Sequence, residues 1–74
     1  MADQELDVRG LNCPLPILKT KKAINTMASG QTIHVLATDP GSVLDFKAFA
    51  AQSGNILLES SESSGVFSFL IKKA

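Results

Sequence analysis

The sequence predicts an α/β (α+β) two-layer sandwich in which two helices cover one face of a four-stranded mixed sheet. Two observations lead to this fold class. Four short segments have the alternation or the β-branched, apolar composition of strands, and apolar residues recur at helical spacing in two longer segments that lie between strands. The predicted order is βαβαββ, and two helices can cover only one face of such a sheet. The 74 residues suffice for one modest core, so we expect a single domain over residues 1–74.

The first strand and the first helix flank a loop that contains the cysteine. Residues 5–9 alternate polar and apolar side chains and stop at Gly10, which indicates a short strand. A helix is predicted from Pro14 to about Ala28, with Gly30 suited to the left-handed position past its end. The predicted inward face of this helix comprises Ile17, Thr20, Ile24, Met27 and Ala28.

A second strand and a second helix follow. Residues 31–37 are β-branched and apolar, which is typical of a strand. Two residues compete as the cap of the next helix: Asp39, which precedes a proline, and Ser42, which stands three residues before an acidic side chain. The sequence leaves this choice open. The helix is expected to end at Gly54, and its predicted inward stripe comprises Val43, Phe46, Phe49 and Ala50.

The last two strands are predicted at residues 55–61 and 66–73, around a polar loop of residues 62–65. In the final strand the residues expected to face the core are Phe67, Phe69 and Ile71. His34 stands in the second strand between two apolar neighbours, so its side chain should lie on the opposite, open face of the sheet. We interpret it as an ordinary surface residue rather than a catalytic base.

Composition argues against nucleic-acid and membrane partners. Seven Lys and Arg residues balance seven Asp and Glu residues, and Trp and Tyr are absent. Direct nucleic-acid binding by bulk charge or base stacking is therefore not expected. The apolar runs are too short to cross a membrane, and the acidic start carries no secretory signal. We expect a cytoplasmic protein without a membrane partner.

The only cysteine, Cys13, is flanked by Pro14 and Pro16 where the first helix should begin. We expect Cys13 to be the N-cap, with the prolines at the first and third helical positions. The amide of Leu15 would then be the remaining donor to the sulfur, and the helix end would favour a reactive thiolate. The alternative is a buried structural cysteine, but the two prolines and the helix start favour a reactive one.

One cysteine and one histidine limit the chemistry available to this chain. An internal disulfide and Cys-x-x-Cys exchange are excluded, and two such side chains fall short of a structural zinc site. We therefore expect no metal and no cofactor, and any sulfur chemistry at Cys13 needs a second molecule. The candidate supporting residues around it are Asp39, Leu15, Lys19 and Lys22.

Residues 6–16, LDVRGLNCPLP, followed by ATDP at 37–40, closely resemble the TusA/SirA-like family of small sulfur carriers. The resemblance extends from about residue 6 to residue 73. It implies a sandwich like the C-terminal domain of translation initiation factor 3. It also implies that Cys13 carries sulfane sulfur as a persulfide, that Pro14 and Pro16 shape its loop, and that Asp39 lies nearby. Family members tied to tRNA thiolation typically have an acidic residue where this chain has Leu15, which suggests a different docking surface.

The resemblance predicts a sulfur carrier or sulfurtransferase-like protein. A cysteine desulfurase or a rhodanese-type donor would load Cys13, and a cysteine-bearing acceptor protein would receive the sulfur. Whether such a carrier counts as an enzyme stays open, because no substrate-pocket signature is visible. The alternative is a regulatory or binding module, redox-sensing or RNA/protein-binding, in which Cys13 carries no sulfur.

Overall fold

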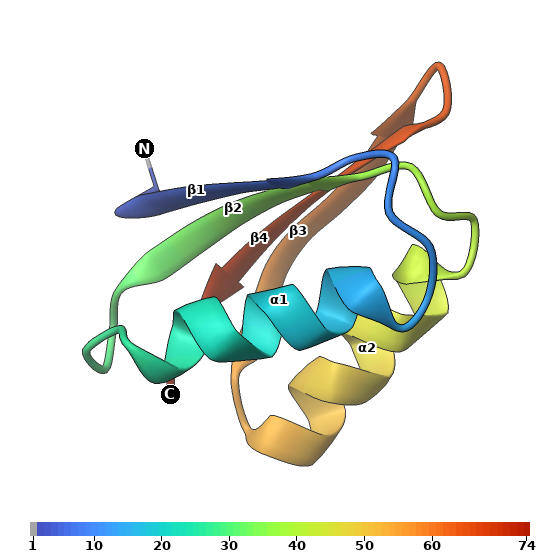
Figure 1. The fold of residues 1–74 in the computed structure, drawn as a ribbon. Coiled ribbons are helices and arrows are strands. Elements are labelled where there is room, and N and C mark those ends of the chain that lie inside the picture. Colours follow the sequence, from blue (N-terminus) through green and yellow to red (C-terminus); the bar gives the residue numbers. More distant parts are fainter. Residues whose placement is uncertain (1) are drawn as a thin grey trace.

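The computed structural model describes residues 2–74. Both helices lie on one face of the sheet and leave the other face open, so the predicted two-layer sandwich is confirmed (Figure 1). Within residues 2–74, neither helix is long and apolar enough to cross a membrane. The elements are β1 (Gln4–Val8), α1 (Leu15–Asn25), β2 (Thr32–Ala37), α2 (Ser42–Ser53), β3 (Ile56–Ser63) and β4 (Val66–Lys72).

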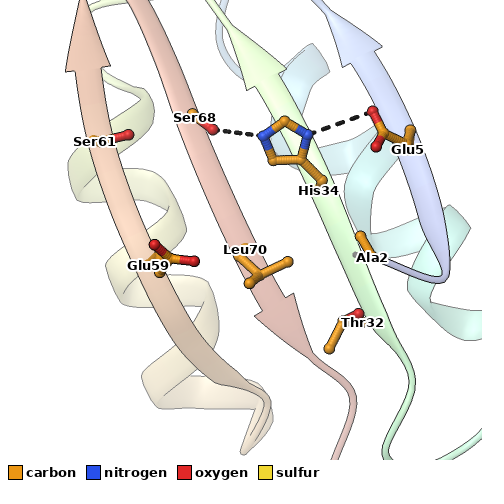
Figure 2. A pocket seen from close by; sticks show the side chains of 8 residues that line it. All are labelled: Ala2, Glu5, Thr32, His34, Glu59, Ser61, Ser68 and Leu70. Carbon is orange, nitrogen blue, oxygen red and sulfur yellow. Dashed lines mark hydrogen bonds and ion pairs between the residues drawn. The ribbon is translucent and has the colours of Figure 1, made fainter.

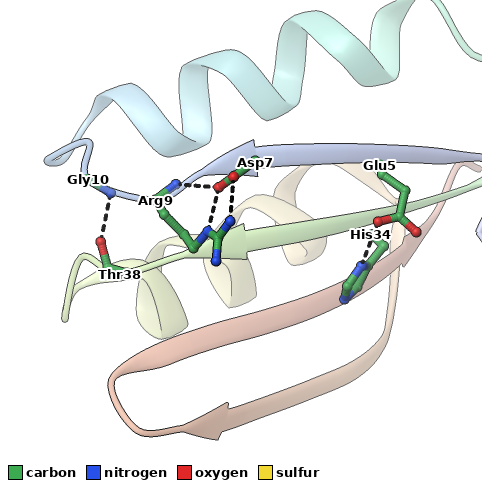
Figure 3. A network of polar contacts seen from close by, with 6 residues as sticks. All are labelled: Glu5, Asp7, Arg9, Gly10, His34 and Thr38. Atoms are coloured by element: carbon green, nitrogen blue, oxygen red, sulfur yellow. Dashed lines mark hydrogen bonds and ion pairs between the residues drawn. The ribbon is translucent and has the colours of Figure 1, made fainter.

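The sheet has the strand order β1-β2-β4-β3 and is mixed. β1 pairs in parallel with β2, with Val8 opposite Ala37, whereas β4 is antiparallel to both of its neighbours. Parallel neighbours end at the same edge of a sheet, so the loops that follow β1 and β2 lie side by side. The amide of Gly10 donates a hydrogen bond of 2.9 Å to Thr38 Oγ1 and ties the two loops together (Figure 3).

The core lies between the helices and the covered face of the sheet. Alternate residues of the two inner strands point into it, and the rings of Phe46 and Phe69 pack with their centroids 4.3 Å apart. The alternation predicted for β4 is therefore confirmed. The buried apolar residues of the core are Val8, Ile24, Met27, Ile33, Val35, Ala37, Phe46, Phe49, Phe69 and Ile71.

Helix α1 ends three residues earlier than predicted. Its C-cap is Thr26, whose hydroxyl donates to the carbonyl of Ala23 at 2.7 Å. The amide of Ala28 donates to the Gln31 side chain at 2.9 Å, a turn contact that replaces a further helical bond. Ala28 is consequently exposed, so its predicted place on the inward face is wrong.

Both predicted caps of helix α2 are wrong. Gly41 is the N-cap, and no side chain caps the helix. Ser42 is the first helical residue, and its amide donates to the carbonyl of Asp39 at 3.0 Å, so backbone rather than side chain closes this turn. At the other end the helix stops at Gly54 as predicted, and this glycine adopts φ +81°, the left-handed conformation that it tolerates.

The final hairpin is tighter than the sequence predicts. β3 runs to Ser63 and β4 begins at Val66, so the predicted four-residue loop shrinks to Ser64 and Gly65. Both adopt positive φ, 52° and 81°, as the two-residue turns of twisted hairpins require. The hairpin projects beyond the rest of the sheet (Figure 1).

Removal of one methyl group tests where the core lies. Ile71 is fully buried, whereas Ile56 is 49% exposed on a neighbouring strand. Ile71→Val should lower the free energy of unfolding by about 1 kcal/mol through lost burial and a small cavity. Ile56→Val, the matched control, should change it by less than about 0.5 kcal/mol. Urea denaturation followed by circular dichroism measures both, and equal losses would contradict the assigned sides of the sheet.

Candidate functional site

Cys13 lies in the loop between β1 and α1, and its side chain is exposed. The Cys13–Pro14 peptide bond is cis. Helix α1 begins one residue later than the sequence predicts: Pro14 is the N-cap and Pro16 the second helical residue. The predicted N-cap position of Cys13 is therefore wrong, and the sulfur stands just outside the helix.

The backbone amide that was expected to donate a hydrogen bond to the sulfur donates to another acceptor. The amide of Leu15 donates to the carbonyl of Asn12 at 2.9 Å, and that of Leu18 donates to the carbonyl of Pro14 at 3.1 Å. Pro16 has no N–H to offer. The helix start is thus closed by its own backbone, and the predicted bond from Leu15 to the sulfur is not formed.

Two carboxylates from other elements approach the sulfur instead. Asp39 follows β2 and Asp45 lies in the first turn of α2; both are half-buried. Cys13 Sγ and one oxygen from each carboxylate lie within 4.8 Å of one another, and we call these three residues the thiol–carboxylate cluster. Gly41 leaves room for it, since an added Cβ would lie 3.2 Å from Asp39 Oδ2 and 3.8 Å from Asp45 Oδ2.

The cluster determines the protonation of the free thiol. A hydrogen bond to Asp45 is the largest factor that raises the pKa of Cys13, followed by partial desolvation and by the negative charges of Asp45 and Asp39. The predicted preference for a thiolate is therefore wrong for the free protein. The physical reason is that a helix N-terminus carries about half a positive charge, whereas the two carboxylates carry two full negative ones.

A groove of about 190 Å³ opens beside the sulfur, between α1 and α2. Lys21 is the basic residue in this groove, and its Nζ lies 5.8 Å from the centre of the Phe49 ring. The predicted candidates Lys19 and Lys22 do not line it; they lie on the exposed side of α1, as does Leu15. The lining residues are Cys13, Pro14, Ile17, Lys21, Asp45, Ala48, Phe49 and Gln52.

The structure therefore combines predicted and unpredicted residues. Asp39 approaches Cys13 because β1 and β2 are parallel neighbours. In the sequence-based prediction Asp45 is only the acidic side chain three residues after Ser42, and Lys21 is not among the supporting candidates. Both residues lie one helical turn from a residue that the prediction names. That spacing alone does not show where their side chains point.

The cluster is a poor match to a metal site. It offers one soft sulfur and two hard oxygens, whereas structural zinc takes four ligands, mostly cysteine and histidine. We assign no metal to it, and the expected lack of a metal stays a prediction.

A second hollow, of about 400 Å³, lies on the open face of the sheet (Figure 2). His34 lies on this open face as predicted and lines the hollow, with Nε2 2.6 Å from Ser68 Oγ and Nδ1 3.5 Å from Glu5 Oε1. The order Ser, His, Glu is that of a hydrolytic triad. However, β2 and β4 are inner strands, so their backbone N–H groups are used in the sheet and cannot stabilise an oxyanion. We therefore assign no hydrolytic role to this hollow.

Comparison with known proteins finds similarity over almost the whole chain. Residues 4–73 match the family model described as sulfurtransferase TusA. The sulfur carrier protein TusA of Allochromatium vinosum is 68% identical over 72 residues, which cover 97% of this chain and 95% of that protein. The crystal structure of a SirA-like protein from Desulfitobacterium hafniense superposes with a TM-score of 0.82 at 25% identity. The superposition covers 93% of this chain and 95% of that one.

The titration of Cys13 tests the electrostatics of the cluster. Folding raises the pKa of this thiol, so the folded state favours its protonated form. The resulting stabilisation is present below the ordinary thiol pKa and is lost as the pH rises through the folded-state pKa. The rate of iodoacetamide alkylation should reach half its maximum at a higher pH in native protein than in urea. A native midpoint at or below the unfolded one would contradict the assignment.

Proposed function

The chain belongs to the TusA family of sulfurtransferases, and on this premise we propose that Cys13 carries sulfane sulfur as a persulfide and relays it to partner proteins. The main support is that the only thiol of the chain is exposed, at the mouth of a groove, within the segment that resembles the family's carrier motif. Pro14 and Pro16 shape the loop, because each fixes one backbone torsion beside the sulfur.

The transfer needs neither a metal nor a cofactor. A thiolate attacks the outer sulfur of a donor persulfide, and a partner thiol later removes that sulfur by the same reaction. With one cysteine in the chain, Cys13 has no internal thiol that could resolve its persulfide. The sulfur can therefore leave only when an external thiol attacks it, which is the property a relay requires.

The proposed donor is a cysteine desulfurase or a rhodanese-type protein, and the proposed acceptor is a cysteine-bearing protein. A reducing cytoplasm suits a carrier with one exposed thiol. Docking would involve the exposed side of α1 beside the groove, where Leu15 is 46% and Leu18 is 50% exposed. Lys19 and Lys22 lie on the same side and would border the docked partner.

Persulfide loading tests the proposal directly. After incubation with glutathione persulfide, intact-protein mass spectrometry should show one added sulfur, and peptide mapping should place it on Cys13. Cys13→Ser is the matched control, because it removes one sulfur atom from an exposed position and should fold normally. A wild-type protein that accepts no sulfur from this donor or from a desulfurase with L-cysteine would favour the regulatory alternative.

The role of Leu15 in docking can be separated from the chemistry. Leu15→Glu places a charge on an exposed apolar side chain. Loading by a desulfurase should slow on the order of tenfold, equivalent to the loss of about 1.4 kcal/mol of docking energy. Loading by glutathione persulfide should not change, because this small donor needs no docking surface. The same loss with both donors would show that Leu15 acts on the thiol rather than on the partner.

A further inference from the structure

A carboxylate oxygen of Asp45 lies within 4.8 Å of Cys13 Sγ, and both residues line the same groove. We propose that Asp45 takes the proton of Cys13 while sulfur is loaded and returns a proton when sulfur leaves. This inference rests on the proposed carrier role of Cys13 and assigns a further catalytic residue to the same site.

The position of Asp45 suits a proton acceptor. It lies in the first turn of α2, where its amide donates to the carbonyl of Gly41 at 3.1 Å. Asp45 also lines the groove in which a second sulfur compound would approach Cys13. Its carboxylate thus reaches the thiol from the side on which the reaction takes place.

The surrounding charges explain why the thiol needs a proton acceptor. The charged groups around Cys13 are Asp39 from the loop after β2, Asp45 from α2, and Lys21 from α1, across the groove. A free thiolate beside two carboxylates is disfavoured, both as the attacking group and as the leaving group. If the proton moves to Asp45 as the new S–S bond forms, the site never holds three negative charges together.

The proposed steps balance in atoms and charge. In loading, the Cys13 S–H proton passes to Asp45, and the sulfur of Cys13 forms a bond to the outer sulfur of the donor persulfide. The donor's S–S bond breaks, and its electron pair leaves on the donor's cysteine as a thiolate. In unloading, an acceptor thiolate takes the outer sulfur, the Cys13 S–S bond breaks, and the Cys13 sulfur regains a proton from Asp45. Neither step consumes an oxidant or a reductant.

Asp45→Asn distinguishes proton transfer from simple electrostatic repulsion, because it should change the rate of alkylation and the rate of sulfur loading in opposite directions. Removal of the negative charge lowers the thiol pKa, so alkylation by neutral iodoacetamide at pH 7 should become several-fold faster. Loading by glutathione persulfide should become slower, on the order of 100-fold, because the proton acceptor is lost. Asp45→Glu keeps a carboxylate and should recover part of the loading rate.

Asp39→Asn is the matched control, since it removes the other charge of the cluster and leaves the Asp45 carboxylate beside the thiol. It should speed alkylation without slowing loading. The inference is overturned if Asp45→Asn speeds both reactions, leaves loading unchanged, or slows both equally. If wild-type protein fails to load, the carrier role itself fails. If wild-type and Asp45→Asn load equally well, only the role of Asp45 fails.

Discussion

The parallel pairing of β1 with β2 is the constraint on which the rest of the site depends. It ends both strands at one edge, where Gly10 and Thr38 connect the two following loops (Figure 3). One loop carries Cys13 and the other carries Asp39. Asp45 follows in the first turn of α2. A parallel pair requires a crossover, here α1, and this crossover supplies one wall of the groove.

The electrostatics at Cys13 result from competition between a helix end and two carboxylates. Pro14 and Pro16 place the helix start next to the sulfur, but the backbone carbonyls of the turn already engage the available amides. Asp39 and Asp45 then dominate the local field and keep the free thiol protonated. Such a thiol resists non-specific alkylation and oxidation, since both need the thiolate. A carrier that waits between partners benefits from this protection.

The two faces of the sheet carry different side chains. The covered face forms the core and, through the helices, the groove beside Cys13. The open face carries polar side chains such as His34 and Ser68, which hydrogen-bond to each other across neighbouring strands. The match to the TusA family model covers residues 4–73, so it includes the strands and helices of both layers as well as the segment that carries Cys13.

The order of elements, most residues of the core and the position of the single cysteine before the first helix could be predicted from the sequence alone. These follow from local periodicity, from glycine and proline positions, and from the fact that the chain has one thiol. Only the tertiary structure decided the state of that thiol, because the groups around Cys13 come from three separate elements. Asp45 is 32 positions away in the chain, and no local pattern indicates that its carboxylate points at the sulfur. The start of each helix was also decided by backbone contacts, such as those of Asn12 and Asp39, which residue type does not reveal.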